Sequence, residues 1–252
     1  MRLDVYMTEK GLAPSRAKAQ EMIKNGCVSV GKETISKPSH DVSEEDKVTL
    51  RENPLMRYVG RGGLKLACAL AYFGISPKGL VAIDIGASSG GFTDCLLQNG
   101  AAFVYAIDAG EGQLHPILLA DSRVESRERT NARYLSADDF ERTPEIAVMD
   151  VSFISQTLIL PSVARVLKNG GTLITLIKPQ FELDKGALGK GGIVKSEKHR
   201  LRAVERVKEA ALSLGLRFLG STECEVHGTD GNVEYLAAFE VNTQKSEVLQ
   251  SE

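Results

Sequence analysis

Apolar runs alternate with one-sided, amphipathic segments from about residue 64 onward. The runs predict strands, and the segments between them predict helices. The expected strands are LVAIDIG (80–86), FVYAID (103–108), VESRE (124–128), IAVMDVS (146–152) and TLITLIK (172–178). The expected helices are GFTDCLLQN, GQLHPILLAD, LPSVARVLKNG and EKHRLRAVERVKEAALSLG. Such alternation predicts a mainly parallel sheet with helices on both faces. Two later runs, RFLGSTECEV and VEYLAAFEV, have no helix between them and are expected to pair antiparallel at one edge.

The first 51 residues follow a different pattern. A short helix ends at Gly11, Ser15 stands at an N-cap position, and a second helix runs to Gly26. CVSVGKETI and VTLR then predict a small sheet. We therefore expect a small α+β domain at 1–51, a linker at 52–63 (ENPLMRYVGRGG), a sheet domain at 64–243 and a polar tail at 244–252.

Composition narrows the class of protein. The 252 residues carry a formal net charge of -2, so any nucleic-acid binding must come from local basic patches. The four cysteines form no C-x-x-C pair, which argues against a zinc site or a disulfide framework. No stretch resembles a signal peptide or a membrane span, so a cytoplasmic protein without membrane contact is expected.

The stretch VAIDIGASSGGF (81–92) has three interpretations. It spells the G-x-S-x-G of a hydrolase elbow, with Ser88, Asp150 and His227 in the right order, but no HGGG-like segment precedes it. Its glycine spacing departs from the G-x-G-x-x-G of dinucleotide sites. A wider loop of this kind suits S-adenosylmethionine. Asp108 ends the next strand, where a carboxylate can accept hydrogen bonds from ribose hydroxyls of either cofactor.

Polar residues stand at the ends of the later strands. Asp150 (MDVSF) and Lys178 (LIKPQFE) follow strands whose carboxyl ends line the ligand crevice of an open α/β sheet. A lysine after TLITLI is locally unusual, although it could simply extend to the rim. Glu234 in GNVEYL and Lys65 in GRGGLKL complete a set of four, and a solvated strand-end glutamate is the plainer alternative for Glu234.

With these residues in place, the chain resembles the TlyA (haemolysin A) family of ribosomal RNA 2′-O-methyltransferases. The resemblance runs through RLDVYMTEKGLAPSRAKAQEMIKNGCVSV, GRGGLKL, DIGASSGGFTDCLLQNGA, DVSFIS, IKPQFE and GNVEYL. It implies an α/β fold: a Rossmann-like class I methyltransferase sheet, FtsJ-like, behind an S4-like RNA-binding domain. The two terminal strands are typical of this version of the sheet.

The resemblance also implies roles for residues. Lys65, Asp150, Lys178 and Glu234 would form a catalytic tetrad, in which Lys178 takes the proton of the ribose 2′-hydroxyl or stabilises the developing alkoxide. S-adenosyl-L-methionine would contact Gly86, Ala87, Ser88, Gly90, Phe92, Asp108 and Asn131, with Asp138 or Asp139 as the alternatives to Asn131 at the adenine. No metal is expected.

Partners follow from the same resemblance. Ribosomal RNA or ribosomal subunits would be bound through Arg2, Arg16, Lys18, Lys24 and Arg61, with no obligatory protein partner. A second basic surface could lie on 195–208, although glutamates alternate with its basic residues. The expected reaction is 2′-O-methylation of ribose, by family at cytidine. The alternatives are a non-catalytic RNA-binding or ribosome-assembly factor and a membrane-active haemolysin.

Overall fold

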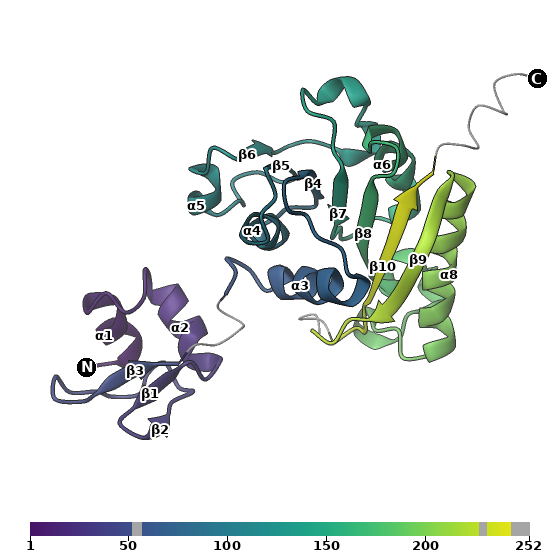
Figure 1. The fold of residues 1–252 in the computed structure, drawn as a ribbon. Helices are drawn as coiled ribbons and strands as arrows, with labels where there is room; N and C mark the ends of the chain where they lie inside the picture. Colours follow the sequence, from purple (N-terminus) through teal and green to yellow (C-terminus); the bar gives the residue numbers. More distant parts are fainter. Residues whose placement is uncertain (52–56, 227–230, 243–252) are drawn as a thin grey trace, which may run out of the picture. The chain divides into compact units, whose positions relative to one another are not determined.

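A computed structural model describes residues 1–51, 57–226 and 231–242. The chain divides into two compact units, Met1–Arg57 and Tyr58–Glu252 (Figure 1). Residues 58–63, which the sequence pattern assigned to the linker, lie in the second unit. Tyr58 is buried there, and it contacts Gly63 so closely that a Cβ at Gly63 would collide with its ring.

The first unit packs two helices on a small sheet. Its elements are α1 (Leu3–Glu9), α2 (Arg16–Lys24), β1 (Val28–Val30), β2 (Glu33–Thr34) and β3 (Val48–Leu50), with strand order β2-β1-β3. Ser15 caps α2 as predicted, because its hydroxyl accepts a hydrogen bond from the Lys18 amide at 3.2 Å. Leu3, Met7, Ile23 and Val28 are fully buried between the helices and the sheet.

The second unit is a seven-stranded sheet with the order β6-β5-β4-β7-β8-β10-β9. Its strands are β4 (Val81–Ile85), β5 (Phe103–Ile107), β6 (Val124–Arg127), β7 (Ile146–Met149), β8 (Thr172–Ile177), β9 (Leu216–Glu223) and β10 (Tyr235–Val241). The five strands from β6 to β8 pair in parallel, and β10 pairs antiparallel with both β8 and β9. The predicted fold class is confirmed, including the antiparallel pair at one edge.

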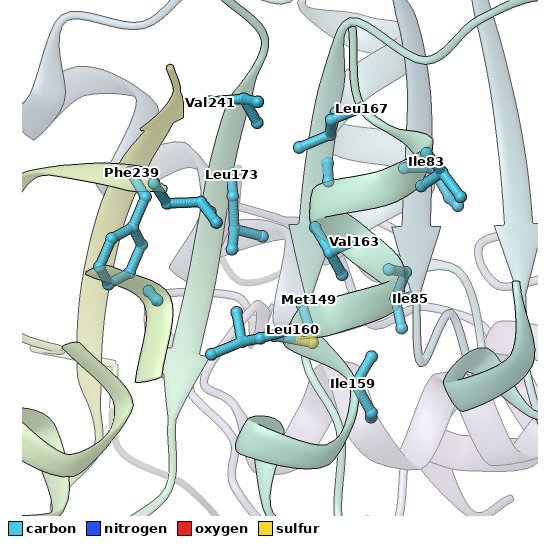
Figure 2. Packing of buried hydrophobic residues seen from close by; sticks show 14 of the residues in the cluster. Ile83, Ile85, Met149, Ile159, Leu160, Val163, Leu167, Leu173, Phe239 and Val241 are labelled. Carbon is cyan, nitrogen blue, oxygen red and sulfur yellow. The ribbon is translucent and has the colours of Figure 1, made fainter. Parts of the chain in front are cut away.

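Helices cover both faces of this sheet. They are α3 (Gly62–Phe73), α4 (Gly91–Gln98), α5 (Pro116–Leu119), α6 (Leu160–Val166), α7 (Pro179–Glu182) and α8 (Glu197–Ser213). Helices α6 and α8 pack on one face, and Figure 2 shows the α6 side chains among those of β4, β7 and β8. Helices α3, α4 and α5 pack on the other face. The apolar strand residues alternate between these two cores, as the pleat of a strand requires.

One predicted helix is much shorter than expected. The sequence predicted a helix over GQLHPILLAD (112–121), but α5 covers only Pro116–Leu119. The amides of Gly112 and Gln113 instead donate to the Glu128 carboxylate, at 2.8 and 3.1 Å. Those bonds hold the segment before Pro116 in an irregular, non-helical conformation against Glu128, which directly follows β6. A helical pattern in the sequence does not reveal such long-range bonds.

Candidate active site

The loop after β4 brings the backbone against the next strand of the sheet. Gly86 has φ +85°, and a Cβ at this position would collide with the carbonyl oxygen of Asp150. Gly90 has φ +91° as the N-cap of α4, and a Cβ there would collide with Leu118. Glycine is therefore required at both positions for conformation and for space. The amides of Gly86 and Ala87 both donate to the carbonyl of Ile107, which fixes the start of the loop on β5.

Asp108 organises this loop from the end of β5. One carboxylate oxygen accepts a hydrogen bond from the Ser88 amide at 2.7 Å, and the other accepts one from the Gly110 amide at 2.7 Å. Each oxygen keeps a further lone pair for a ligand hydroxyl. Asp108 thus both shapes the loop and faces the cavity in front of it.

Two cavities lie in front of the loop. The larger, of about 500 Å³, is lined by Gly86, Ser88, Asp108 and Asn131 among the predicted cofactor residues. The smaller, of about 220 Å³, is lined by Gly86, Ala87, Ser88 and Phe92 of that set, together with Lys178. Both cavities share Gly86, Ser88, Asp150 and Ser152. Six of the seven predicted cofactor residues therefore line this space, and Gly90 lies behind it as a helix cap.

Lys178 is held at the edge of the smaller cavity. Its Nζ lies 2.5 Å from the Asp150 carboxylate and donates to the Ser152 hydroxyl at 2.9 Å. Asp150 directly follows β7, and Lys178 directly follows the neighbouring strand β8. Parallel strands end at the same edge, so the two side chains meet although 28 residues separate them in the sequence.

A second ion pair joins Lys65 of α3 to Glu234. The Lys65 Nζ lies 2.5 Å from a Glu234 carboxylate oxygen, and both side chains are almost fully buried. Tyr235 pairs with Ile177, so the register carried on by one residue places Glu234 opposite Lys178. Met149, Ile177 and Tyr235 belong to the core under α6 and α8. Strand alternation therefore directs Asp150, Lys178 and Glu234 to the opposite face, which α3 covers.

The geometry does not support the hydrolase interpretation. Ser88 has φ +48°, as a strained elbow would, but its hydroxyl donates to the Gln113 side chain at 3.2 Å. Asp150, the required acid, pairs with Lys178. His227, the required base, lies outside the described residues.

Several residues that line the larger cavity were not among the predicted site residues. Val151, Ser152, Phe153 and Ile154 follow Asp150 in the sequence, so their place beside it could have been inferred. Gln113 and Thr130 also line this cavity, and the fold brings them there from elsewhere in the sequence. Phe153 has φ +64° and is 92% exposed, with its ring 5.2 Å from that of Phe181.

A buried carboxylate lies in the strand behind the loop. Asp84 is fully buried in β4 and accepts a hydrogen bond from the Thr93 hydroxyl at 2.7 Å. Its other oxygen has no hydrogen-bond partner in the described part of the chain. Burial raises the pKa of Asp84 to about 7, and the nearby carboxylates of Asp150 and Asp108 add to this.

The predicted RNA-binding residues are mostly exposed, but several have partners. Arg2 and Arg16 both bond the buried Asp4, and Lys18 pairs with Glu21. Lys24 is exposed in the last turn of α2, and Arg61 is exposed at the N-cap of α3. On the predicted second basic surface, Arg200 and Arg206 donate to backbone carbonyls and Lys208 pairs with Glu205. That surface therefore offers fewer free cations than its sequence indicates.

Comparisons with known proteins give the family of each unit. Residues 58–241 match the FtsJ-like methyltransferase family, and residues 1–48 match the S4 domain. Hemolysin A of Brachyspira hyodysenteriae is 41% identical over 95% of this chain and 99% of its own length. The 16S/23S rRNA (cytidine-2′-O)-methyltransferase TlyA of Mycobacterium tuberculosis H37Rv is 38% identical over 97% of this chain and 91% of its own.

A solved structure extends the likeness to three dimensions. A candidate hemolysin of Streptococcus thermophilus is 41% identical, has a TM-score of 0.76, and matches 96% of this chain and 89% of that one. These findings confirm the resemblance inferred from the sequence motifs. Within the described residues, every helix is too short or too polar to cross a membrane.

Proposed function

The chain belongs to the FtsJ-like methyltransferase family and carries an S4 domain, and we propose that it methylates the 2′-hydroxyl of ribose in ribosomal RNA. The observation that carries this proposal is a pair of ion pairs: Lys178 with Asp150 lines the smaller cavity in front of the loop after β4, and Lys65 bonds Glu234, which is in register with Lys178. The TlyA relative named above acts, by its name, on cytidine, and we propose the same nucleotide here. We place the protein in the cytoplasm, where its RNA substrate is.

The site fits S-adenosylmethionine on structural grounds. The glycine loop keeps the backbone open where a Cβ would collide, and Asp108 offers acceptors to a ribose. We assign the larger cavity, with Asp108 and Asn131, to the adenosine end and the smaller cavity to the methionine end. When bound, the cofactor supplies an electrophilic methyl group on a sulfonium sulfur.

The chain's own residues prepare the hydroxyl. Lys178 Nζ is the group that meets it, either accepting its proton or donating a hydrogen bond to the oxygen as negative charge develops. Asp150 and Ser152 hold Nζ in one place, so that little reorganisation is needed during the reaction. We assign Lys65 and Glu234 to the ribose, because their buried ion pair lies on the same face of the sheet.

The N-terminal unit would supply affinity for RNA. Basic side chains that contact phosphates give salt-dependent binding and fix the orientation of the partner, without reading sequence. Arg2, Arg16, Lys18 and Lys24 on this unit, and Arg61 beyond it, are the residues to which we assign these contacts. Ribosomal subunits or free ribosomal RNA are the partners consistent with this role.

The test is transfer of labelled methyl from S-adenosylmethionine to unmodified ribosomal subunits. We expect label on a ribose for the wild type, and a loss of at least about 100-fold for Lys178→Ala. Lys168→Ala is the matched control, because it removes a surface lysine whose ion pair within the described residues is with Glu145 at 3.2 Å, away from both cavities. Cofactor binding without any methyl transfer by the wild type would instead favour a non-catalytic RNA-binding factor.

A further inference from the structure

One buried carboxylate holds two arginines together on the N-terminal unit. Asp4, in the first turn of α1, is 0% exposed. It accepts hydrogen bonds from Arg2 Nε and Nη2 at 3.0 Å each and from Arg16 Nε at 3.0 Å. Gln20 of α2 adds a fourth bond at 2.7 Å. Asp4 thus ties the segment before α1 to the first turns of α2.

Two guanidinium groups share the carboxylate of Asp4. Arg2 is also stabilised by the negative charge of Asp41, with which it forms a β-bridge. In the described part of the chain, Arg16 forms an ion pair only with Asp4, and its Nη nitrogens bond no acceptor. The arginine side chains are 44% and 55% exposed, while Asp4 is buried. The outer N–H groups of Arg16 are therefore available to a further anion.

Satisfying Asp4 alone would not need this arrangement. The two hydrogen bonds from Arg2 and the one from Gln20 already supply three donors to the carboxylate. The bonds from Arg2, assisted by Gln20 and Arg16, hold the pKa of Asp4 well below its usual range, so the cluster keeps its charges at any physiological pH. Arg16 therefore adds a fixed, half-exposed cation beside the first one.

We propose that Asp4 is the positioning residue of a phosphate-binding pair, fixing Arg2 and Arg16 so that their outer N–H groups grip the RNA backbone together. The proposal rests on the proposed function, because RNA is the ligand. Guanidinium groups bind phosphate with directed, charge-assisted hydrogen bonds. Arginines already held in place lose less conformational freedom when the phosphate arrives.

The experiment compares two charge-removing variants of the full chain. Asp4→Asn and Asp46→Asn each remove one negative charge from the same unit, but the Asp46 carboxylate bonds the amide and hydroxyl of Ser43 and, in the described part of the chain, no arginine. If only the net charge of the unit mattered, both variants would bind the negatively charged RNA at least as tightly as the wild type. Positioning predicts that Asp4→Asn binds an unmodified ribosomal RNA transcript about tenfold more weakly, whereas Asp46→Asn does not. Binding by Asp4→Asn as tight as that of the wild type would overturn the proposal.

A second variant keeps the charge and leaves Asp4 paired. Arg16→Lys removes the planar guanidinium group and its Nε hydrogen bond to Asp4, while Arg2 and Gln20 still bond Asp4. This variant therefore tests the positioning of Arg16 even if Asp4→Asn fails to fold. We expect it to weaken binding about as much as Arg16→Ala does. Full affinity in Arg16→Lys would show that only charge matters. In Asp4→Asn, a further Arg16→Ala change should cost little, because the pair is already disordered.

Measuring methyl transfer beside RNA binding distinguishes a failure of the positioning role of Asp4 from a failure of the proposed reaction. If the wild type methylates RNA and Asp4→Asn binds RNA equally well, only the positioning role fails. If the wild type binds RNA but transfers no methyl group, the proposed reaction fails while the arginine pair stands.

Discussion

Phe153 combines a left-handed backbone with an almost fully exposed aromatic ring at the rim of the larger cavity. An exposed ring in that position is suited to stacking on an unpaired base, which contributes about 1–3 kcal/mol per base. We expect Phe153→Ala to lower methyl transfer to RNA at least tenfold, with a smaller loss of cofactor affinity, because Phe153 also lines the larger cavity, and with thermal stability unchanged. Phe153→Gly should be as inactive, yet more stable by roughly 1 kcal/mol, because glycine accepts positive φ without strain. Single-turnover methylation and thermal unfolding measure the two effects. An active Phe153→Ala variant would exclude the stacking role.

Asp84 makes stability depend on pH. Its pKa in the folded protein, about 7, lies above the ordinary value of a carboxyl group. Between about pH 4 and pH 7 the folded state therefore binds more protons than the unfolded state, and the free energy of unfolding falls as pH rises. The free energy of unfolding of Asp84→Asn, relative to that of the wild type, should rise by roughly 2–4 kcal/mol between pH 4 and pH 8. Denaturant titrations of both proteins at the two pH values measure this difference, and an equal difference at both would contradict the role of Asp84.

At the scale of elements, Glu182 of α7 fastens the segment after β7. Its carboxylate accepts the Ser155 hydroxyl at 2.5 Å and the Gln156 amide at 2.8 Å, and burial raises its pKa. Gln156 in turn bonds the Leu176 carbonyl and the Thr175 hydroxyl of β8, at 2.6 and 2.8 Å. These buried bonds hold the segment on which Ser152 and Phe153 lie.

Glu182→Ala should therefore loosen that segment. It leaves the buried Gln156 amide unpaired, which costs about 1–3 kcal/mol, while the Ser155 hydroxyl keeps its hydrogen bond with the Thr157 hydroxyl at 2.8 Å. We expect methyl transfer to fall at least tenfold while cofactor affinity changes little. Glu182→Gln should stay near wild type, because its amide can accept from Gln156 and donate to Ser155. Single-turnover rates of methyl transfer and titrations with the cofactor, measured for both variants, distinguish these outcomes. Equal loss in the two variants would point to charge and not to geometry.

Local pattern predicted most of these elements but few of their contacts. Apolar runs and helical spacing suffice for the parallel strands, because each signal lies within one segment. Asp150 and Lys178 could be placed together, since both follow strands of one parallel sheet. The pairing of Lys65 with Glu234 joins residues 169 positions apart, and no local signal specifies it. The shortened α5 likewise depends on the long-range hydrogen bonds of Gly112 and Gln113 with Glu128, and no pattern in the sequence indicates the positive φ of Phe153.

For the whole molecule, a net charge of -2 and a basic N-terminal surface make binding sensitive to salt. Three phosphates, one bound by Arg2 and Arg16 together and one each by Lys18 and Lys24, predict roughly a 30-fold loss of RNA affinity between 50 and 200 mM salt. Affinity for S-adenosylmethionine should stay nearly constant over that range, because the site that we assign to it has no exposed cluster of like charge. Filter binding and calorimetry at several salt concentrations test this contrast. RNA affinity that did not change with salt concentration would show that the basic residues of the N-terminal unit do not contact the RNA.

Strand β10 lies between β8 and β9 although it is the last strand in sequence. Glu234 enters the site immediately before this strand, and its partner Lys65 is near the start of the second unit. A chain still emerging from the ribosome therefore holds Lys178 and Asp150 but lacks the second ion pair until residues 234–241 are free. The second ion pair forms only after Glu234 and β10 have been made, so a nascent chain stalled before β10 should carry the loop after β4 without the pair of Lys65 with Glu234.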